Sequence, residues 1–593
     1  MSEYNAPLKD MQFVLRDLAG LDRILQMPGF ADISDDVVDQ VLEEAARFSR
    51  EVLGPLNMPG DQEGCRVENK TVIVPDSFAD AYGQFVAGGW QSLPSSPEFG
   101  GMGLPETVAA ATMEMWQSSN LAFSLCPLLT SGAIAAIDAH ASDELKRTYM
   151  PGMVSGAWTG TMDLSEPQAG SDLAAVKVKA VPDGDHYRIS GTKIFITWGD
   201  QEFSENVIHL VLARLADAPD GVRGLSLFLV PKYLVNDDGS VGDRNDAYCT
   251  SVEHKLGIHA SPTCVITYGD GDGAIGYLVG EESRGLAGMF TMMNHARLNV
   301  GIQGLAICER AYQLAKTYAR ERIQGEAPGE KGRVTIIHHP DVRRMLLVMK
   351  SLIEAMRATA YTTAAMVDTV HHGADEKDRA VASARAALIT PVVKGWMSEV
   401  AQELTSLGVQ VHGGMGFVEE TGAAQHMRDA RILTIYEGTT GIQANDLVGR
   451  KILLDDGKAM KELLEEMRSL DKDLASVDEL ATIRAALSGG IEDLAATTDW
   501  LIANAPDDQN VPGAASVNLL MLAGTVIGGW QMARAALAAT RRLADGDPDP
   551  AFFEAKLITA RFYAEHILSR SSGYRQAAIA GSETMMALPE ESF

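Results

Sequence analysis

The sequence predicts a multidomain α+β protein in which a helical domain, a β domain and two further helical domains follow one another. The chain has 593 residues, which is too many for one hydrophobic core and suggests roughly three to five structural units. Before residue 155 and after residue 285, apolar residues recur at helical spacing. Between these regions, apolar and polar residues alternate as in strands. The order differs from the strand–helix alternation of a doubly wound fold.

The expected domain boundaries follow these changes of pattern. DVVDQVLEEAARFSREVL, for example, repeats apolar residues every three or four positions, as an amphipathic helix does. We expect an N-terminal extension with one or two short helices, an N-terminal helical domain, a middle β domain, a helical bundle and an additional helical domain, over residues 1–35, 36–155, 156–280, 281–450 and 451–593.

The middle domain carries hairpin and strand signals. VKVKAVPDGDHYRISGTKIFIT (176–197) alternates on both sides of a PDGD turn, which predicts a hairpin. NVIHLVLARL (206–215) and RGLSLFLVPK (223–232) predict two more strands. GDGAIG (271–276) matches a dinucleotide-binding pattern, but no helical pattern follows and the neighbouring aspartates would repel a pyrophosphate. We interpret it as a turn.

Composition limits the partners and the compartment. Asp and Glu outnumber Lys and Arg by 80 to 50, and the net charge of −30 argues against nucleic acid and anionic membranes as partners. Five cysteines without a CxxC motif indicate a reducing compartment. The N-terminus lacks the features of a signal peptide, and LLMLAGTVIGGW (519–530) is too short to span a bilayer and predicts a buried core helix. We expect a cytoplasmic protein with no transmembrane segment and no metal site.

Four separate stretches combine small residues with hydrogen-bonding residues. They are MDLSEPQAGSD (162–172), KIFITWGD (193–200), QVHGGMGF (410–417) and IYEGTTGIQ (435–443). Glycine lets backbone N–H groups approach a ligand closely. Each stretch alone is also compatible with a turn or a close helix contact, and Glu437 with an ordinary exposed glutamate.

Taken together and in this order, these motifs and YARERI (318–323) resemble those of the acyl-CoA dehydrogenase family. The motifs fall within residues 36–450. The resemblance implies the acyl-CoA dehydrogenase fold, with a helical domain, a β-barrel-like middle domain and a four-helix-bundle domain, here extended by a C-terminal helical domain. It also implies an FAD-dependent enzyme that removes a proton from the α-carbon and a hydride from the β-carbon of an acyl-CoA thioester.

The resemblance assigns the role of general base to Glu437. A thioester α-proton is weakly acidic, so its removal needs a positioned base with a raised pKa. A carboxylate in a dry apolar site is more basic because its charged form is poorly solvated, and Ile435, Tyr436 and the flavin ring would supply that dryness. In the family, the backbone N–H of this glutamate and a flavin ribityl hydroxyl bind the thioester oxygen, as in an oxyanion hole.

The resemblance also implies which residues contact FAD and substrate. The flavin side is expected at Met162, Leu164, Ser165, Gly170, Ser171, Phe195 and Thr197. The adenine half and the diphosphate are expected at Thr439, Gly441, Arg322, Gln410, Gly413 and Gly414. In the family, Arg322 and the Gln410 motif reach the flavin of the neighbouring subunit, which implies at least a dimer. Ser171, Arg297 and Glu437 are expected at the acyl-CoA, although Arg297 is also compatible with a helix-surface arginine.

Three features depart from the family pattern. Arg322 is followed by Ile-Gln-Gly where Phe-Gly is usual, and a longer loop follows at 325–340. Pro340 stands where a flavin-binding glutamine is common, and Gln168 where glycine is usual. The adenine-side contacts therefore stay open at this stage.

The two ends of the chain indicate a branch of the family. EYNAPLKDMQFVLRDLAGLD at the start and the helical tail of 451–593 resemble a bacterial branch that oxidises 3-(methylthio)propanoyl-CoA to methylthioacryloyl-CoA in dimethylsulfoniopropionate degradation. Relatives with the same extensions act on straight-chain acyl-CoAs, and a thioether sulfur is close to a methylene in size. The alternative is therefore a short- or medium-chain fatty acyl-CoA dehydrogenase of β-oxidation.

Three other functions are compatible with the family resemblance, which also leads us to expect a particular electron acceptor and oligomeric state. An acyl-CoA oxidase would pass electrons to oxygen, whereas a dehydrogenase would pass them to an electron-transfer flavoprotein, which we expect. A DNA-associated flavoprotein would need a basic surface, and an inactive scaffold would not need the intact Glu437 motif. Because the helical tail would occupy the surface where a second dimer packs in tetrameric relatives, we expect a homodimer.

Overall fold

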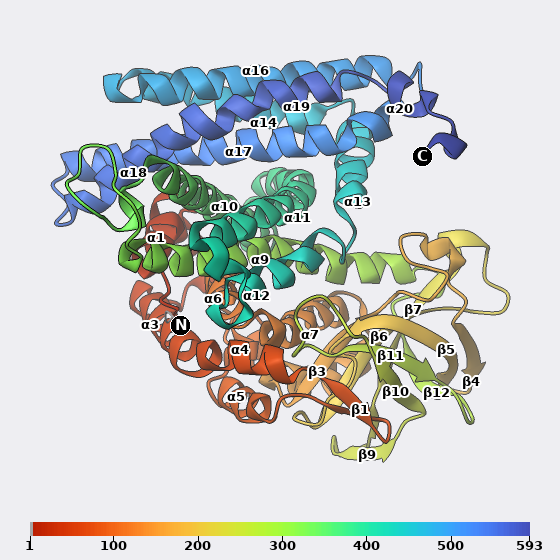
Figure 1. Ribbon diagram of the computed structural model, residues 1–593. Helices are drawn as coiled ribbons and strands as arrows, with labels where there is room; N and C mark the ends of the chain where they lie inside the picture. Colours follow the sequence, from red (N-terminus) through yellow and green to blue (C-terminus); the bar gives the residue numbers. More distant parts are fainter. Residues whose placement is uncertain (1–3) are drawn as a thin grey trace. The chain divides into compact units, whose positions relative to one another are not determined.

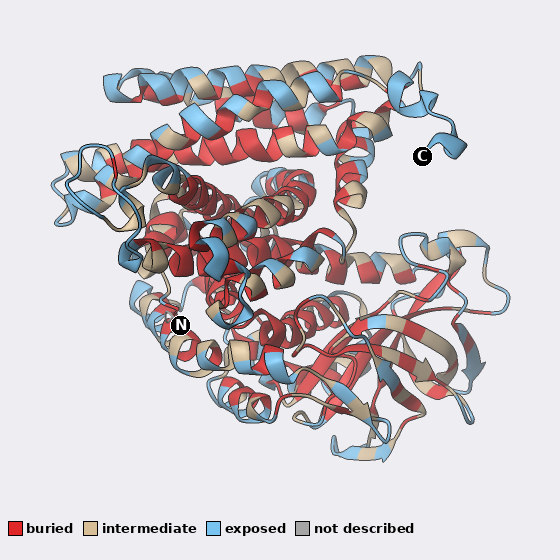
Figure 2. Cartoon of the chain, in the orientation of Figure 1, coloured by how far each residue is buried: buried red, intermediate tan, exposed pale blue. Residues whose placement is uncertain are grey.

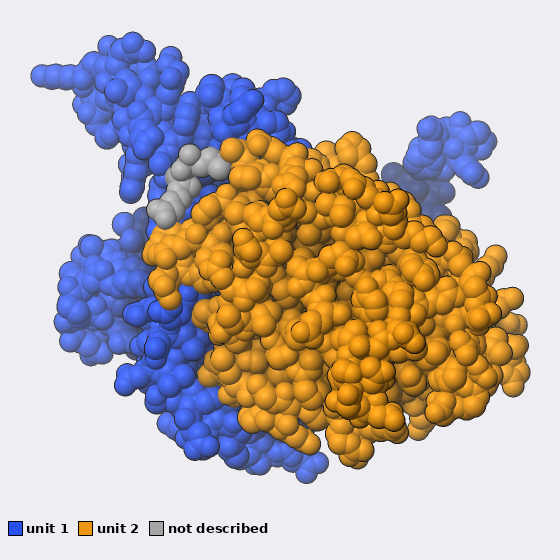
Figure 3. Space-filling view, turned by 90° about the horizontal axis from the view of Figure 1, so that it is seen from below, with its two compact units in different colours: residues 1–46, 105–118, 300–593 blue, residues 47–104, 119–299 orange. Residues whose placement is uncertain are grey.

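The computed structural model describes residues 4–593, which divide into two compact units (Figure 1, Figure 3). Unit 1 comprises the described part of Met1–Ala46 together with Pro105–Ser118 and Val300–Phe593. Unit 2 comprises Arg47–Leu104 and Ser119–Asn299. Helices α3 (Asp35–Phe48) and α9 (Gly285–Glu321) have residues in both, as does α6 (Glu106–Ser119) through its last residue, Ser119.

Unit 2 is built on one mixed sheet with the strand order β10-β11-β5-β12-β7-β6-β3, in which β4 also pairs with β5 and β6. Neighbouring strands run antiparallel except for the parallel pairs of β3 with β6 and β4 with β6. The strands are β3 (Trp158–Asp163), β4 (Lys179–Asp183), β5 (His186–Thr197), β6 (Asn206–Arg214), β7 (Leu225–Pro231), β10 (Ala247–Val252), β11 (Thr263–Tyr268) and β12 (Ala274–Val279). Short hairpins β1–β2 (Arg66–Glu68, Thr71–Ile73) and β8–β9 (Tyr233–Val235, Val241–Arg244) complete the β structure.

Burial explains the sequence pattern of the central strands. β7 is buried along its whole length and β6 along all but its last residue, as the red strands of Figure 2 show. A strand covered on both faces has no solvent side, so it reads as a continuous apolar run rather than as an alternation. Ile189, Val211, Phe228 and Ile266 belong to this core. The predicted strands at 206–215 and 223–232 are confirmed.

The predicted hairpin at 176–197 is confirmed, since β4 pairs antiparallel with β5 and Asp183 lies opposite His186. The interpretation of GDGAIG (271–276) as a turn is wrong for its second half. Ala274, Ile275 and Gly276 begin β12 and pair with β5. A strand needs neighbours on the sheet rather than a long local pattern, and these neighbours come from distant parts of the chain.

Helices cover part of the sheet in unit 2. Its helices are α4 (Gly54–Glu63), α5 (Asp76–Ala87), α7 (Leu121–His140) and α8 (Asp143–Ser155). Asn120 caps α7 by accepting a hydrogen bond from Phe123 N at 3.1 Å. α7 packs against β3. A Cβ at Gly160 would overlap the Ala133 side chain of α7, so glycine permits this close packing.

Unit 1 is helical. Its helices are α1 (Leu8–Phe13), α2 (Leu21–Ile24), α6 (Glu106–Ser119), α10 (Pro340–His372), α11 (Glu376–His412), α12 (Ala423–Ala430), α13 (Thr440–Asn445), α14 (Lys458–Ser469), α15 (Asp471–Ala475), α16 (Ala481–Asn504), α17 (Val511–Ala544), α18 (Pro550–Phe562), α19 (Ser571–Ala578) and α20 (Glu583–Ala587). α10 and α11 pack as an antiparallel pair, and α17 packs against both. The small residues of α17 allow this approach, because a Cβ at Gly524 would overlap the Trp396 ring of α11.

Two helices of residues 4–593, α7 and α17, are long and apolar enough to cross a membrane by length and composition. Their most apolar windows are 83% and 67% buried inside the protein. Core helices of soluble proteins meet the same criterion, so this is weak evidence for a span. The predicted core helix at 519–530 is confirmed, because this stretch lies within α17 and most of it is buried.

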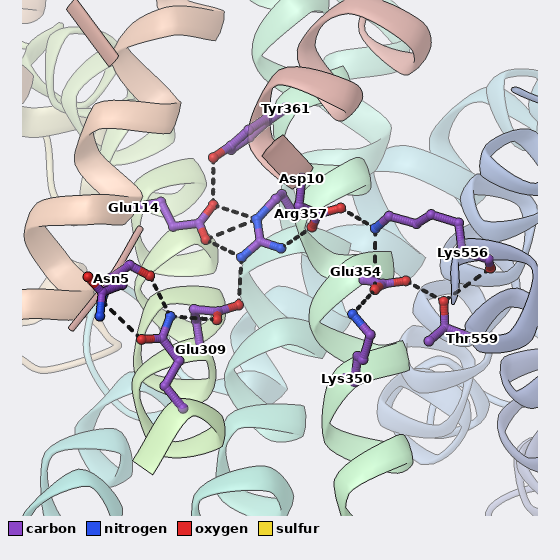
Figure 4. Close-up of polar contacts among 11 residues, drawn as sticks. Asn5, Asp10, Glu114, Glu309, Lys350, Glu354, Arg357, Tyr361, Lys556 and Thr559 are labelled. Carbon is purple, nitrogen blue, oxygen red and sulfur yellow. Dashed lines mark hydrogen bonds and ion pairs between the residues drawn. The ribbon is translucent and has the colours of Figure 1, made fainter. Parts of the chain in front are cut away.

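A buried charge network joins three separate parts of unit 1 (Figure 4). Arg357 of α10 donates to Glu114 of α6 at 2.6 Å, to Glu309 of α9 at 2.8 Å and to Asp10 of α1. Lys556 of α18 pairs with the same Asp10. The N-terminal extension, the bundle and the additional C-terminal helices therefore share one set of interactions.

Further members satisfy the remaining polar atoms of this network. Tyr361 donates to Glu114 at 2.6 Å, and Thr559 donates to Glu354 at 2.6 Å. Lys350 and Lys556 both pair with Glu354, at 2.6 and 3.3 Å. Burial raises the pKa of Asp10, but Lys556, Arg357 and Lys350 outweigh it and hold the pKa below its usual value. Its stabilising contribution is therefore present above about pH 4 and is lost as the pH falls through the folded-state pKa.

Replacement of Arg357 by Met should destabilise the protein strongly, because three carboxylates would lose their shared buried cation. Breaking a buried ion pair by removing one partner costs about 3–5 kcal/mol. Urea unfolding at pH 7, followed by circular dichroism, measures the loss. Arg561→Met is the control, because Arg561 is 63% exposed and pairs with Glu565; its cost should stay below about 1 kcal/mol. Equal losses in the two variants would contradict a special role for the network.

Candidate active site

In unit 2, the first glycine-containing motif begins at the end of β3. Met162 is the penultimate residue of this strand, and Leu164 and Ser165 follow it; all three are half-buried. Asp163 is fully buried and accepts hydrogen bonds from Thr161 Oγ1 at 2.6 Å and from the Tyr268 hydroxyl at 2.5 Å. Because side chains alternate along a strand, Met162 points away from the Asp163 side. The buried carboxylate thus fixes the strand end that carries Met162.

A buried ion pair holds the loop that follows. Glu166 accepts hydrogen bonds from the backbone N–H groups of Lys177 and Val178, at 2.7 and 3.0 Å. The Lys193 ammonium of β5, 0% exposed, donates to Glu166 and to the Leu164 carbonyl, each at 2.8 Å. Burial raises the pKa of Glu166, but Lys193 and these backbone donors lower it below its usual value. Both ends of the loop are therefore tied to one strand.

Within this loop, Gly170 and Ser171 are exposed. A Cβ at Gly170 would meet no atom within 4 Å, so the backbone there is open to a ligand. Gln168, the departure from the family pattern, uses its side chain inside the loop, where its amide donates to Glu166 at 2.6 Å and to the Ala175 carbonyl at 3.1 Å. The substitution therefore reinforces the turn.

A β-bulge turns Phe195 outward. β5 and β11 pair as Ile196–Cys264 and Lys193–Ile266, so β5 carries one extra residue at this point. Phe195 has φ 60° and is 60% exposed, although it lies in a strand of the sheet. A left-handed backbone at a bulky residue is strained and is found mainly at functional sites. An exposed aromatic ring held in this way fits a stacking surface for a flat ligand such as an isoalloxazine ring.

Thr197 and its neighbour Trp198 have different surroundings. Thr197 pairs with Thr263 of β11 and is half-buried. Trp198 is 1% exposed and donates from its indole to the Ala122 carbonyl at 3.0 Å, so it belongs to the core. Arg297 of α9 is only 3% exposed, and the alternative of a helix-surface arginine is therefore wrong.

In unit 1, the Glu437 motif forms a tight left-handed turn. Glu437 has φ 55° and Gly438 has φ 91°. Thr439 then caps α13, because its hydroxyl accepts a hydrogen bond from Ile442 N at 3.2 Å. The glutamate carboxylate thus lies on a turn immediately before a helix, and its residue is half-buried rather than exposed.

Three residues from α9, α11 and α13 hold this turn. The Tyr436 hydroxyl donates to Gln303 of α9. Gln443 donates to the Glu437 carbonyl at 3.2 Å, and the Lys394 ammonium of α11 donates to the Gly438 carbonyl at 2.5 Å. Burial and the nearby Glu437 charge raise the pKa of Tyr436 well above its usual value, so this phenol stays neutral.

The QVHGGMGF motif ends α11 at an exposed turn. Gln410, Gly413 and Gly414 are exposed, and Gly413 has φ 60°. No atom lies within 4 Å of a Cβ built on either glycine. The residue before the turn, His412, is buried and packs its ring against Tyr318, with 4.6 Å between ring centroids and a tilt of 33° between the planes. An exposed glycine backbone fits the approach of a diphosphate.

The departures around Arg322 form a small closed structure. Arg322 is exposed just after α9, and Ile323 bridges to Thr335. Gln324 N donates to Val334 O and Val334 N to Gly325 O, both at 3.0 Å, which closes the loop. Pro340 starts α10 at a position where no N–H is needed. The proline therefore serves the helix start, and the expected adenine-side role of this region stays a prediction.

The predicted residues thus form two sets. Unit 2 brings together the Met162–Ser171 stretch, Phe195 and Thr197 around β3 and β5. Unit 1 brings Glu437, Thr439 and Gly441 into one turn before α13, and it places Gln410, Gly413 and Gly414 at the end of α11. Among residues 4–593, no group of three His, Cys, Asp or Glu side chains could hold a metal ion.

Family models match four consecutive parts of the chain. They are the acyl-CoA dehydrogenase N-terminal, middle and C-terminal domains and an acetyl-CoA dehydrogenase C-terminal-like domain, over residues 37–157, 161–270, 283–452 and 459–589. A 3-methylmercaptopropionyl-CoA dehydrogenase of Ruegeria pomeroyi is 49% identical, with 96% of this chain and 97% of the relative covered. The chain belongs to the acyl-CoA dehydrogenase family.

Two other matches extend this result. A broad-specificity linear acyl-CoA dehydrogenase of Mycobacterium tuberculosis is 35% identical over the full length of both chains. The crystal structure of an acyl-CoA dehydrogenase complexed with FAD from Bacillus anthracis has a TM-score of 0.73 at 21% identity, covering 94% of this chain and 90% of that one. The predicted fold class is confirmed, including the extra C-terminal domain. As an acyl-CoA dehydrogenase, the protein is an FAD-dependent oxidoreductase.

Sequence reasoning missed the residues that hold the site segments in this acyl-CoA dehydrogenase. They are Asp163, Glu166, Lys193, Lys394 and Gln443. A signal was present for Lys193 and Glu166, since a lysine directly before the apolar IFI of β5 and a glutamate inside SEPQAGSD are charges where burial is expected. Lys394 stands in the apolar run PVVKGWM (391–397) and carries the same signal, but nothing local indicates that its partner is the turn after Glu437.

Lys193→Met should loosen the Leu164–Val178 loop and weaken FAD retention. The change leaves Glu166 buried without its cation, and every 1.4 kcal/mol lost from binding weakens it about tenfold. The flavin-to-protein absorbance ratio after dialysis measures retention. Lys179→Met on β4 is the matched control, because Lys179 is exposed in the same unit. Full retention of FAD by Lys193→Met would contradict a role of the ion pair in forming the cofactor surface.

Proposed function

We propose that the protein dehydrogenates 3-(methylthio)propanoyl-CoA to 3-(methylthio)acryloyl-CoA. The observation that carries this proposal is the similarity to the Ruegeria pomeroyi 3-methylmercaptopropionyl-CoA dehydrogenase along nearly the whole of both chains. Because 96% of this chain is covered, the similarity extends into both the N-terminal extension and the C-terminal helices.

The alternative substrate is a short or medium straight-chain acyl-CoA of β-oxidation. It is supported by the full-length similarity to a relative named as a broad-specificity linear acyl-CoA dehydrogenase. A thioether sulfur and a methylene are similar in size and polarity. A pocket distinguishes groups that differ by one methylene by only about 1–3 kcal/mol. We therefore expect one pocket to accept both, with the methylthio substrate preferred.

Glu437 would act on the α-carbon of the thioester. Its carboxylate would take the α-proton, and its backbone N–H would bind the thioester oxygen on which negative charge develops. The half-buried positions of Glu437 and Tyr436 and the neutral Tyr436 phenol support a site of limited hydration, whereas Ile435 is 48% exposed and does not supply the expected cover. FAD, when bound, supplies the acceptor for the β-hydride. Phe195, Ser165 and Thr197 would hold its ring system.

The physiological partners are part of the same proposal. We expect an electron-transfer flavoprotein as electron acceptor, a homodimer as the assembly and the cytoplasm as the compartment. The dimer is supported by the exposed backbone of the Gln410–Gly414 turn and the exposed side chains of Met415 and Phe417, which are 48% and 87% exposed. An apolar surface of this kind at a cofactor motif suits a neighbouring subunit.

Anaerobic reduction of the purified holoenzyme tests the reaction and its base. With 3-(methylthio)propanoyl-CoA, butanoyl-CoA and octanoyl-CoA added separately, flavin absorbance should bleach fastest with the methylthio substrate. Glu437→Gln should bind the same substrate and bleach at least about a hundredfold more slowly, because positioned proton transfer contributes about 10²–10⁴-fold. Turnover in air with little hydrogen peroxide would agree with a dehydrogenase.

Three results would contradict parts of this proposal. A large preference for octanoyl-CoA would assign the enzyme to straight-chain β-oxidation. Bleaching of Glu437→Gln at the wild-type rate would exclude Glu437 as the base. Stoichiometric hydrogen peroxide during turnover would identify an acyl-CoA oxidase.

The assembly is tested separately by gel filtration with light scattering. The holoenzyme should elute with twice the chain mass of 63.6 kDa. Phe417→Asp should shift the equilibrium toward the monomer and reduce FAD content with it, because a charge would be buried in an apolar contact. The exposed substitution Leu454→Asp is the control, since Leu454 is 80% exposed away from the cofactor motif. A tetramer would contradict the homodimer.

A further inference from the structure

The Glu437 turn is held in a conformation that its own sequence disfavours. Glu437 and Gly438 have φ 55° and 91°, so two consecutive residues lie in the left-handed region. An L-residue there is strained, and the conformation persists only where surrounding contacts determine it. The direction of the Glu437 carboxylate and of its N–H therefore depends on whatever fixes the two following carbonyl groups.

Two buried side chains fix those carbonyl groups. Lys394 donates from its ammonium to Gly438 O at 2.5 Å, and Gln443 donates to Glu437 O at 3.2 Å and to Gly438 O at 3.4 Å. Lys394 and Gln443 are both 0% exposed. They come from opposite sides in sequence, Lys394 from the middle of α11 and Gln443 from α13. The Gly438 carbonyl is thus shared by a cation and an amide.

Glycine at 438 is part of the same arrangement. A Cβ there would lie 2.7 Å from Gln443 Nε2, so the amide reaches the two carbonyls only because the side chain is missing. The left-handed φ at this residue also favours glycine. The turn, the amide and the ammonium therefore fit together as one unit.

A buried lysine at position 394 is energetically unfavourable unless its ammonium has a specific role. Burying an ammonium costs several kcal/mol, and an apolar side chain of the same volume would fill the space without that cost. A charge-assisted hydrogen bond is roughly twice as strong as a neutral one. A buried cation that donates to the peptide directly after the base therefore fixes that peptide more firmly than a neutral donor would.

We propose that Lys394 is a positioning residue for the catalytic base. It holds the Gly438 carbonyl so that the Glu437 carboxylate and N–H are oriented before the thioester binds. Orientation of this kind lowers the barrier without adding a contact to substrate, and a shift of about 1 Å can cost 10²-fold in rate. The inference rests on the proposed role of Glu437 as the base.

The test follows proton removal alone. Acetyl-CoA has no β-carbon and cannot be dehydrogenated, but its α-hydrogens exchange with D2O when the base removes a proton and returns a deuteron. Mass spectrometry of acetyl-CoA after incubation with holoenzyme measures this exchange. Wild type, Lys394→Met, Lys394→Gln and Glu437→Gln are compared, with thermal unfolding and FAD content recorded for each.

Lys394→Met should slow the exchange and kcat by about 100-fold, while KM changes less than about threefold. Lys394→Gln keeps a hydrogen-bond donor of similar length. Its exchange rate should be at least about tenfold higher than that of Lys394→Met, because the donor still orients the Gly438 carbonyl. Arg385→Met is the matched control. Arg385 lies on the same helix, is 9% exposed and pairs with Glu466, so its loss should lower stability but leave exchange intact.

The outcomes separate the inference from the function on which it rests. Wild-type exchange in Lys394→Met would overturn the positioning role, as would equal losses in Lys394→Met and Lys394→Gln. A loss in Arg385→Met as large as that in Lys394→Met would make the effect one of stability only. Wild-type exchange in Glu437→Gln would instead remove Glu437 as the base. If Lys394→Met does not fold, Gln443→Met tests the same carbonyls and should slow exchange in the same direction.

Discussion

The buried Arg357 of α10 forms ion pairs with helices from several parts of unit 1. Its guanidinium meets carboxylates from α1, α6 and α9, and through Asp10 it connects to Lys556 in the additional C-terminal helices. Burial alone would lower the pKa of Arg357, but Glu114, Asp10 and Glu309 raise it well above its usual value. The cation is therefore permanent, and three segments that are far apart in sequence must assemble around it. The C-terminal helices are therefore an integral part of the unit 1 core, because they share buried charges with the bundle.

Buried cations also hold the two site segments, each with fewer partners than Arg357 has. In unit 2, Lys193 holds Glu166 and the Leu164 carbonyl, and this fixes the loop that begins the cofactor motif. In unit 1, Lys394 holds the carbonyl that follows Glu437. Both lysines are fully buried, and both act on segments whose backbone is irregular. Apolar packing alone cannot select one conformation of such a loop, because apolar contacts have no direction, whereas an ammonium and a carbonyl do.

The sequence was sufficient for those features that are local. The hairpin at 176–197, the buried strands and the core helix at 519–530 could be predicted because their periodicity or length is visible in a short window. The start of β12 was misinterpreted because Ala274 and Gly276 acquire their strand partners from β5, far away in the chain. The outward turn of Phe195 is another feature that depends on the partner strand, since a bulge exists only relative to β11.

The candidate site shows the same division. Glu437, Thr439 and the glycines around them could be identified because the chemistry needs those residue types within a few positions of each other. The role of Lys394 could not, because its partner lies 44 residues further along the chain, and the apolar residues around Lys394 indicate burial but not what the charge binds. Residues that perform chemistry are therefore easier to recognise than residues that hold them in place. The second kind are recognised by the cost of burying them, and that cost is visible only in the folded chain.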